Sequence, residues 1–433
     1  MISLQIESLD QEGRGVARRD GKTIFIDGAL PGETVECSSY RKKRNFELAS
    51  LNRLVKASAL RSVPRCPFFG KCGGCSLQHL DVRAQVAMKQ RVIEDDLWHI
   101  GRVVPELVLP AIHGPTWGYR HRARFSVRYV AKKGGMLVGF HEKRSSYVAD
   151  MTSCEVMAPQ VSALIAPLRA TLGRLSIRER IPQVEVSVGA DGTVLVLRIL
   201  QPLTEDDRAV LKAFAEQHAV RFYLQPRGPD SAHPFWPAAE ADLYYTLPEF
   251  DLKLRFAPTD FTQVNHAVNR VLVRRALRLL DPQPGERVAD LFCGIGNFTL
   301  AIARCGAHVI GVEGSSELAA RAAANAAANR LAHATEFRVL NLFEIDQAGL
   351  GAIGPLDRML IDPPREGAIA VVKALPENAP ARIVYISCNP ATLARDAAVL
   401  VHGRGYRLSA AGVVNMFPHT SHVESVAVFD KEV

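Results

Sequence analysis

The residues best suited to chemistry stand at the ends of short apolar segments in the C-terminal part of the chain. Five such segments, RVADLFCG, AHVIGVEG, TEFRVLN, DRMLIDPP and RIVYISCNP, place Asp290, Glu313, Asn341, Asp362 and Cys388 at or near their ends. Helix-forming stretches such as SSELAARAAANAAANR separate them, and this alternation predicts a parallel sheet covered on both faces. Because ligands bind outside the carboxyl ends of such strands, these side chains are expected to face one crevice.

The first strand end has the composition of a nucleoside site. Gly294 and Gly296 let the backbone approach a ligand closely, and Glu313 follows Asp290 by 23 residues, the usual spacing for a carboxylate that binds a ribose diol. Asn341 is placed to bond an adenine edge. The third glycine of the dinucleotide fingerprint is missing, so a pyrophosphate is not the natural ligand. S-adenosylmethionine therefore fits better than a nicotinamide or flavin cofactor.

Cys388 could be a buried core residue or a nucleophile. It closes the fifth strand just before a predicted helix, and a helix N-terminus favours the thiolate. Beside a methyl sulfonium a thiolate has one specific use. Carbon 5 of a pyrimidine lacks a lone pair, and attack of sulfur at carbon 6 creates an enolate whose carbon 5 can accept the methyl group. The sequence therefore favours a reactive thiol.

This chemistry also needs a base that removes the proton from carbon 5. The candidates lie in the segment NMFPHTSHVESVAVFD. If the last strand runs antiparallel to the others, it begins at the carboxyl edge of the sheet, and Glu424 near its start reaches the crevice. His419 and His422 are rival candidates, and a surface position without a role remains an alternative for Glu424.

A second group of reactive residues lies much earlier. Cys66, Cys72 and Cys75 follow the spacing C-x5-C-x2-C, and the isolated Cys154 could supply a fourth thiolate. Four cysteines can hold zinc or an iron-sulfur cluster. Zinc sites more often show two paired C-x2-C units, so the single trio favours iron and sulfur. Cys37 stands alone and is expected in a core.

The segment WGYRHRARFSVRY predicts a strand with a basic face. Arg120, Arg122, Arg124 and Arg128 alternate with apolar residues, so an extended chain projects them from one side. Guanidinium groups suit phosphate oxygens, which favours contact with RNA or DNA over a salt-bridged sheet surface. The net charge of +8 and the pI of about 9.1 agree with a polyanionic partner.

Length and composition bound the architecture. A chain of 433 residues, 48% hydrophobic, is expected to form two or three globular domains. We divide it into 1–58, a small antiparallel β-barrel with turn signals, 59–258, a central α+β domain with the cysteines, and 259–433, the α/β domain. No signal-like N-terminus and no long apolar run is present, which predicts a cytoplasmic protein without a membrane segment.

The motifs DLFCGIGNFTL, IDPPREG, SCNPATLARD and FPHTSHVE resemble the signature blocks of the S-adenosylmethionine-dependent RNA (uracil-5)-methyltransferases. The likeness extends over nearly the whole chain, and the N-terminal barrel resembles a TRAM domain, an OB-like RNA-binding module. The resemblance implies a Rossmann-like sheet with an antiparallel last strand, and a helical piece at 85–111 that packs with the catalytic domain.

The same resemblance implies the roles of individual residues. Cys388 would be the nucleophile and Glu424 the base. Contacts to S-adenosylmethionine would come from Gln263, Phe292, Asn297, Glu313, Asn341 and Asp362. The four cysteines Cys66, Cys72, Cys75 and Cys154 match the ligands of a [4Fe-4S] cluster. A barrel combined with a cluster is typical of members that act on 23S ribosomal RNA, and we expect a monomer.

Three alternatives stay open at this point. Some relatives with both features modify another ribosomal site or a transfer RNA. Amino-group methylation at the DPP turn is disfavoured, because such enzymes usually place an aromatic residue after the prolines, where this chain has Arg365. An RNA-binding iron-sulfur protein with an inert methyltransferase fold is the third alternative.

Overall fold

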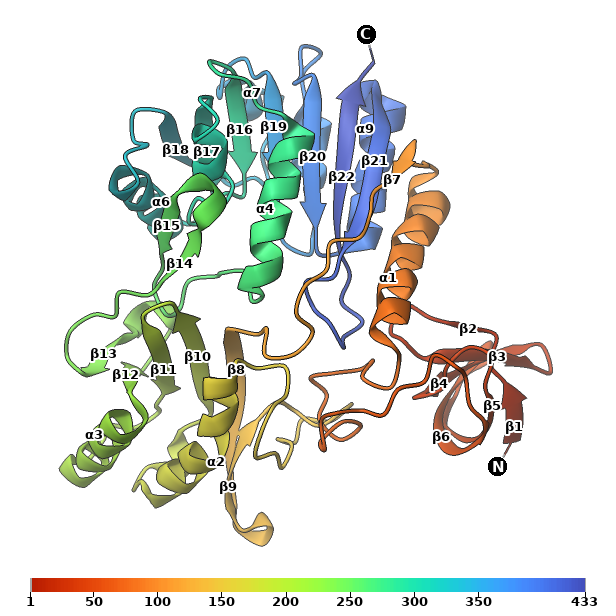
Figure 1. Cartoon of the computed structure of the whole chain (residues 1–433), viewed down its shortest axis with the longest axis vertical. Helices are drawn as coiled ribbons and strands as arrows, with labels where there is room; N and C mark the ends of the chain where they lie inside the picture. The colour runs from red at the N-terminus through yellow and green to blue at the C-terminus, as the bar shows by residue number, and fades with distance from the viewer. Residues whose placement is uncertain (1, 433) are drawn as a thin grey trace.

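The computed structural model describes residues 2–432, which form three larger sheets and one two-stranded sheet. In Figure 1 the eight-stranded sheet occupies the upper half of the molecule. The six-stranded sheet of the central part lies below it, and the six-stranded N-terminal sheet lies at the lower right. No helix among the described residues is long and apolar enough to cross a membrane.

The N-terminal sheet has the order β1-β5-β6-β4-β3-β2. Buried and less buried residues alternate along β4, where Ile24 and Ile26 point to the same side. These side chains belong to the small core of the N-terminal sheet. The prediction of a purely antiparallel barrel is wrong in one respect, because β4 and β6 pair in parallel. The strands are β1 (Ile2–Gln5), β2 (Ser8–Leu9), β3 (Gly15–Arg19), β4 (Lys22–Asp27), β5 (Thr34–Lys42) and β6 (Phe46–Lys56).

The central sheet has the order β13-β12-β11-β10-β8-β9, and its apolar face packs against two helices. A capping box at Thr204 and Asp207 begins the second helix. The strands are β8 (Arg122–Val130), β9 (Gly135–Gly139), β10 (Gln183–Gly189), β11 (Gly192–Arg198), β12 (Val220–Gln225) and β13 (His233–Trp236). The helices are α2 (Pro159–Arg174) and α3 (Glu205–His218).

The eight-stranded sheet has the order β18-β17-β16-β19-β20-β22-β21-β7. The first five strands are parallel, and four of them are mostly buried, whereas the edge strand β18 is not. Strand β22 runs antiparallel between β20 and β21, as expected from the sequence. The strands are β16 (Arg287–Leu291), β17 (His308–Glu313), β18 (Thr335–Val339), β19 (Arg358–Ile361), β20 (Arg382–Ser387), β21 (Tyr406–Val414) and β22 (Glu424–Lys431).

Helices cover both faces of this sheet, and a small hairpin lies beside it (Figure 1). The helices are α4 (His266–Leu280), α5 (Thr299–Ala303), α6 (Ser316–Ala328), α7 (Gln347–Gly351), α8 (Ile369–Ala374) and α9 (Pro390–Arg404). The hairpin consists of β14 (Tyr244–Leu247) and β15 (Leu252–Arg255). Asn325 on α6 holds it by accepting from the Arg255 N–H and donating to the Arg255 carbonyl.

A segment from early in the chain completes the sheet. Helix α1 (Val82–Asp96) continues as a π-helical turn (Leu97–Gly101) and packs against α9, and β7 (Leu107–Val108) then pairs in parallel with β21. The residues between the helix and β7 are extended rather than helical, because Arg102 adopts a left-handed conformation with φ of 54° and ends the helix. The predicted helical piece at 85–111 is therefore helical only to Gly101.

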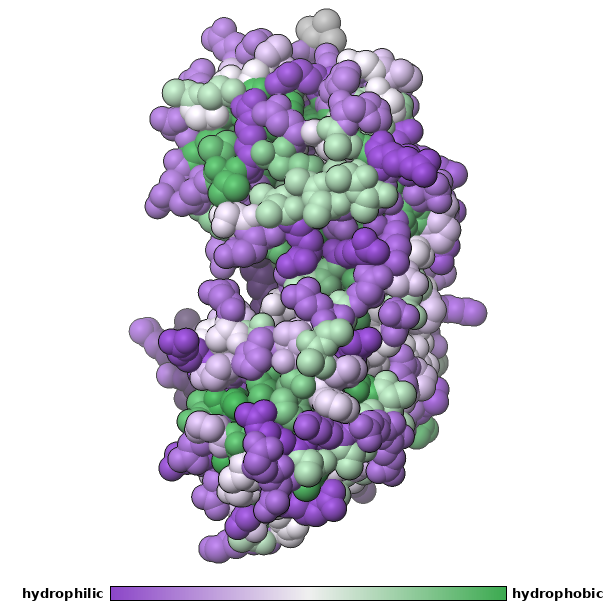
Figure 2. Space-filling model, turned by 90° about the vertical axis from the view of Figure 1, so that its left-hand side faces the viewer, coloured by the Kyte–Doolittle hydropathy of each residue, from purple (hydrophilic) through white to green (hydrophobic). Residues whose placement is uncertain are grey.

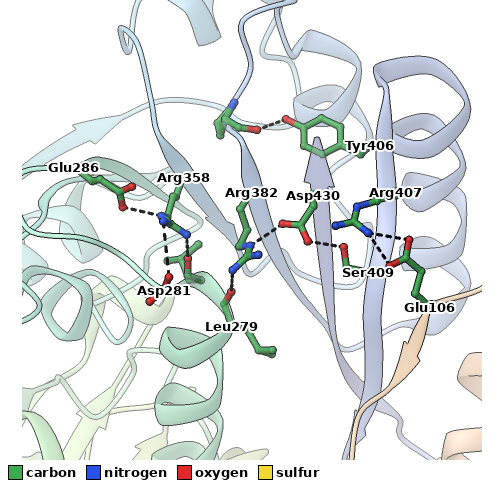
Figure 3. Close-up of polar contacts among 12 residues, drawn as sticks. Glu106, Leu279, Asp281, Glu286, Arg358, Arg382, Tyr406, Arg407, Ser409 and Asp430 are labelled. Atoms are coloured by element: carbon green, nitrogen blue, oxygen red, sulfur yellow. Dashed lines mark hydrogen bonds and ion pairs between the residues drawn. The ribbon is translucent and has the colours of Figure 1, made fainter. Parts of the chain in front are cut away.

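A chain of polar contacts fixes the opposite edge of the sheet, at the amino ends of the parallel strands (Figure 3). Arg358 donates to Glu286 at 2.7 Å, and Arg382 donates to Asp430 at 2.7 Å. Arg407 on β21 pairs with Glu106 next to β7 at 2.9 Å. These partly exposed contacts hold the strands in register at their amino ends. A site can therefore form at the carboxyl edge, which these contacts do not occupy.

Candidate active site and cysteine site

A cavity of about 500 Å³ opens at the carboxyl ends of the parallel strands. Its walls come from the loops after β16, β17, β18, β19 and β20, from the loop before α4 and from the start of β22. Every cofactor-binding and catalytic residue expected from the sequence lines this one cavity, namely Gln263, Phe292, Asn297, Glu313, Asn341, Asp362, Cys388 and Glu424. In Figure 2 the outline of the molecule narrows between the upper lobe and the central part.

The loop after β16 turns sharply at the cavity. Phe292 has a φ of 63°, and Gly294 and Gly296 have φ values of 55° and 93°. A side chain at Gly296 would also collide with Leu300 at the start of α5. Glycine is therefore required for both conformation and packing, and the backbone of this loop forms a wall of the cavity.

Glu313 at the end of β17 has a fixed carboxylate. One oxygen accepts a hydrogen bond from the Gly294 N–H at 2.9 Å, and the other accepts from Gly314 at 2.8 Å and Ser315 at 3.1 Å. Charge-assisted hydrogen bonds of this kind are among the stronger ones. The carboxylate thus holds the glycine loop in place and presents its remaining lone pairs to the cavity.

The two predicted asparagines line the cavity but bond mainly to other residues of the chain. Asn297 accepts from Tyr245 at 2.9 Å and pairs with the Asn269 amide at 2.9 and 3.1 Å. Asn341 donates to Glu344 at 2.9 Å and accepts from the Phe343 N–H at 3.1 Å. Both side chains are held in one orientation by these contacts.

Sequence reasoning missed several aromatic and basic residues of the cavity. The Phe343 ring lies 5.6 Å from that of Phe292, and Phe261 is 69% exposed. Phe417 and Arg365 complete this group. Exposed aromatic rings at a cavity suit stacking on a base or an adenine. Their closeness in sequence to expected site residues is the signal that could have found two of them. Phe261 precedes Gln263 by two residues, and Phe343 follows Asn341 by two residues.

Cys388 lies half-buried at the cavity, between the end of β20 and α9. Burial raises the pKa of its thiol to about 12, and the Glu424 and Asp362 carboxylates add to this effect. Arg365 opposes the shift. The expectation that the helix N-terminus lowers this pKa is therefore wrong, because desolvation and two negative neighbours outweigh its effect.

Glu424 is the first residue of β22 and is 4% exposed. Burial raises the pKa of its carboxyl to about 7, and Lys89 and Arg365 oppose the shift. Its Oε2 atom has no hydrogen-bond partner among the described residues. A buried carboxyl with a free oxygen at a cavity and a pKa near neutrality suits a general base.

The rival histidines differ in position. His419 is buried, stacks on Trp117 with ring centroids 3.8 Å apart, and does not line the cavity. His422 lines the cavity, and its Nδ1 lies 3.3 Å from the Arg365 guanidinium. Burial and Arg365 lower the pKa of His422. Of the three candidate bases, Glu424 and His422 line the cavity and His419 does not.

The four early cysteines line a separate small cavity with an apolar wall. Cys66, Cys72, Cys75 and Cys154 are brought together there, although no group of three or more His, Cys, Asp or Glu residues between 2 and 432 meets the geometry of a closed metal site. Burial raises the pKa of Cys75 to about 12 and that of Cys154 to about 11. The Gly74 N–H points to the Cys72 sulfur at 3.4 Å.

The four arginines do not share one environment. Arg122 is half-buried and pairs with Glu185 of β10 at 2.5 Å, while Arg124 and Arg128 are exposed. Arg120 precedes β8, lines the cysteine cavity and lies over the Phe140 ring at 5.5 Å. The expectation of a single four-arginine face is therefore wrong for Arg120, because the strand begins only at Arg122.

Comparison with known proteins places these features in a family. Residues 89–432 match the family model described as tRNA (uracil-5-)-methyltransferase, and residues 2–43 match the TRAM domain. A relative from Nitrosospira multiformis is 64% identical over 98% of both chains, and one from Dechloromonas aromatica is 62% identical over 98% of this chain and 99% of its own. Both are named 23S rRNA (uracil(1939)-C(5))-methyltransferase RlmD.

The fold comparison agrees. The crystal structure of Pyrococcus abyssi tRNA (uracil-54, C5)-methyltransferase in complex with S-adenosyl-L-homocysteine has a TM-score of 0.75 at 23% identity, covering 99% of this chain and all of that one. Since its identity is low, it supports the fold alone. The sequence relatives and the family model confirm the resemblance seen in the motifs, and this chain belongs to the RNA (uracil-5-)-methyltransferase family.

Proposed function

We propose that this protein transfers a methyl group from S-adenosylmethionine to carbon 5 of a uridine in 23S ribosomal RNA, at the position that its relatives' names give as 1939. The observation that carries this proposal is the single cavity in which Cys388 and Glu424 meet the predicted cofactor residues. Identity of 60–64% over nearly the whole chain supports the ribosomal substrate.

The proposed reaction uses both residues in sequence. The Cys388 S–H proton passes to the Asp362 carboxylate at the same cavity, and the sulfur forms a bond to carbon 6 of uracil, moving the double-bond electrons towards carbon 5 and oxygen 4. S-adenosylmethionine would supply the methyl group that carbon 5 accepts. Glu424 then takes the carbon 5 proton, the sulfur to carbon 6 bond breaks, and the ring double bond reforms.

RNA carrying 5-fluorouridine at the target tests this route. Fluorine cannot leave as a proton does, so a stable covalent complex is expected after methyl transfer. The complex should be absent for Cys388→Ala and present for Glu424→Gln, because the base acts only after the bond to sulfur has formed. Absence of an adduct with the wild type, or an equal yield from Cys388→Ala, would reject the covalent mechanism.

The substrate is tested by mapping 5-methyluridine in ribosomal and transfer RNA from a deletion strain. We expect the loss of one 23S residue, restored by the intact gene. Loss from a transfer RNA instead would favour the alternative substrate. Intact RNA modification combined with failure to bind S-adenosylhomocysteine would favour an inert RNA-binding protein. A ribosomal RNA substrate further implies a cytoplasmic location, and a monomer remains our expectation.

The four cysteines support a [4Fe-4S] cluster as the second cofactor. All four cysteines line one small cavity, and thiolates are the donors that iron-sulfur clusters use. Cys66, Cys72, Cys75 and Cys154 would hold the cluster. Anaerobically purified protein should be brown and contain about four irons per chain. Stoichiometric zinc without iron would reject this assignment.

RNA contact is proposed for the N-terminal sheet and for the exposed arginines of β8. Arg124 and Arg128 are exposed and can reach phosphates, although Arg124 also makes a 3.5 Å contact with Glu185, whereas Arg122 serves a buried ion pair with the same carboxylate. The TRAM match to residues 2–43 supports a role of the N-terminal sheet in binding RNA.

A further inference from the structure

Lys89 on α1 is a fully buried lysine, with 0% of its surface exposed. Its Nζ atom donates to Asn415 Oδ1 at 2.8 Å and to the Phe417 carbonyl at 2.8 Å. Lysine is almost never fully buried unless its ammonium group is paired, because removing that group from water is costly. Both acceptors lie in residues 415–423, which we call the base loop because it connects β21 with Glu424 at the start of β22.

Helix α1 holds the base loop at more than one point. Gln85 lies one helical turn before Lys89, and its Oε1 accepts from the His419 N–H at 2.8 Å. Gln90 accepts from the Val413 N–H at 3.0 Å, just before the loop begins. The helix therefore sets the position of the loop, and Lys89 is the only one of these three side chains that brings a charge.

The charges around Glu424 come from several elements. The positive ones are Lys89 on α1 and Arg365 after β19, and both oppose the rise in the Glu424 pKa. The negative or ionisable ones are Asp362 at the end of β19 and Cys388 at the end of β20, whose pKa values Glu424 in turn raises. His419 and His422 belong to the base loop itself, and Lys89 and burial lower the pKa of both.

Lys89 differs from Arg365 in its surroundings. Arg365 is exposed and lies at the cavity where substrate enters, so its charge is screened by water and can be engaged by RNA. Lys89 does not line the cavity and is fully buried, and its contacts are with Asn415 and Phe417 of the base loop. Burial lowers the pKa of Lys89 itself to about 7, and Glu424 opposes this shift, so Lys89 carries its full charge on the acid side of neutrality, where it is little screened by water.

We propose that Lys89 is a positioning residue for the proton-abstraction step. It fixes the base loop through Asn415 and Phe417, and its positive charge favours the ionised form of the Glu424 carboxyl. This inference rests on the proposed function. Glu424 must be ionised to accept the carbon 5 proton, and a carboxyl buried without a nearby cation would stay protonated at neutral pH. Formation of the bond between Cys388 and carbon 6 does not need this charge.

The two steps can be separated experimentally. Lys89→Met removes the charge and nearly preserves the volume, and Gln90→Met on the same helix removes one loop contact without any change of charge. For each full-length variant we would measure covalent trapping of 5-fluorouridine RNA, which precedes the base, and release of tritium from [5-³H]uridine RNA, which requires it. Lys89→Arg tests whether a cation of another shape restores release.

We expect Lys89→Met to trap 5-fluorouridine RNA within about twofold of the wild-type rate but to release tritium about tenfold more slowly at pH 6.5. In the plot of tritium-release rate against pH, the acid limb should shift to higher pH by about one unit. On this limb each pH unit changes the ionised fraction of Glu424 about tenfold. Gln90→Met should keep the wild-type profile, and Lys89→Arg should recover part of the shift.

An unshifted acid limb in a Lys89→Met protein that still melts cooperatively and binds S-adenosylhomocysteine would overturn the proposal. Equal losses in trapping and tritium release would also overturn it, because they would indicate a general structural role. Failure of the wild type to trap RNA would instead count against the proposed function itself, so the two failures are distinguishable.

Discussion

The N–H of Leu77 donates a hydrogen bond to the carbonyl of His419 at 2.9 Å, and the neighbouring Ser76 N–H donates to the same oxygen. These bonds join the segment that follows Cys75 directly to the base loop. The cysteine segment and the loop that leads to Glu424 are therefore linked through backbone hydrogen bonds, which do not depend on the conformation of any side chain.

Loss of the proposed cluster is thus expected to loosen the base loop. Cys75→Ser, or chelation under air, should increase hydrogen exchange of amides at 415–423 while leaving exchange in β16 unchanged. Mass spectrometry of exchanged peptides measures this directly. The control is the reconstituted protein, which should regain protection. Unchanged exchange in the loop of metal-free protein would show that the cysteine segment holds its shape alone.

Substitution of Glu424 should change stability in a pH-dependent way. Its folded pKa of about 7 lies above the ordinary value of 4.5, so the folded state binds more protons between these values, and its stability falls as the pH rises through about 7. Glu424→Gln should therefore raise the melting temperature at pH 8 and change it little at pH 5. Equal shifts at both values would mean that the carboxyl is not buried in solution.

Substitution of Glu313 should weaken cofactor binding without unfolding the protein. Glu313→Gln loses the charge-assisted bonds to the glycine loop, and such bonds contribute about 1.5–3 kcal/mol each. Calorimetry should give a dissociation constant for S-adenosylhomocysteine that is larger by at least about tenfold. The matched control is Glu317→Gln, an exposed carboxylate on the next helix that lies outside the cavity, and its affinity should not change.

The arginines of β8 should separate into two classes. Arg124→Ala and Arg128→Ala should each reduce the slope of RNA affinity against salt concentration by about one counterion. Arg122→Ala should instead lower the melting temperature, because it leaves Glu185, which is 4% exposed, without its closest cation. Filter binding at several salt concentrations and thermal melting distinguish the two outcomes. A uniform effect of all three on RNA affinity would contradict this division.

Much of the site was predictable from strand ends. In a parallel sheet the carboxyl ends of the strands meet at one edge, so Glu313, Asp362 and Cys388 could be placed together from the sequence alone. The antiparallel final strand then brought Glu424 to the same edge. The alternation of strands and helices indicates the parallel sheet, whereas the antiparallel direction of the last strand was implied by the family resemblance.

Other features could not be predicted, because they depend on packing between distant segments. Lys89 reads as an ordinary solvent-facing residue of a polar helix, and only the contact with the base loop buries it. Arg120 appeared to continue the basic strand face, but the chain enters the strand two residues later. The pKa of Cys388 depends on carboxylates from two other strands, which no local pattern shows.

The pairing of β7 with β21 has a consequence for the order of folding. The residues joined at this edge, such as Glu106 and Arg407, are 301 positions apart, with the whole central sheet between them. Contacts of such long sequence separation form slowly, because a large loop must close first. On the ribosome the last strands emerge long after α1, so the face of α1 that carries Lys89, Val92 and Ile93 stays uncovered until synthesis is nearly complete.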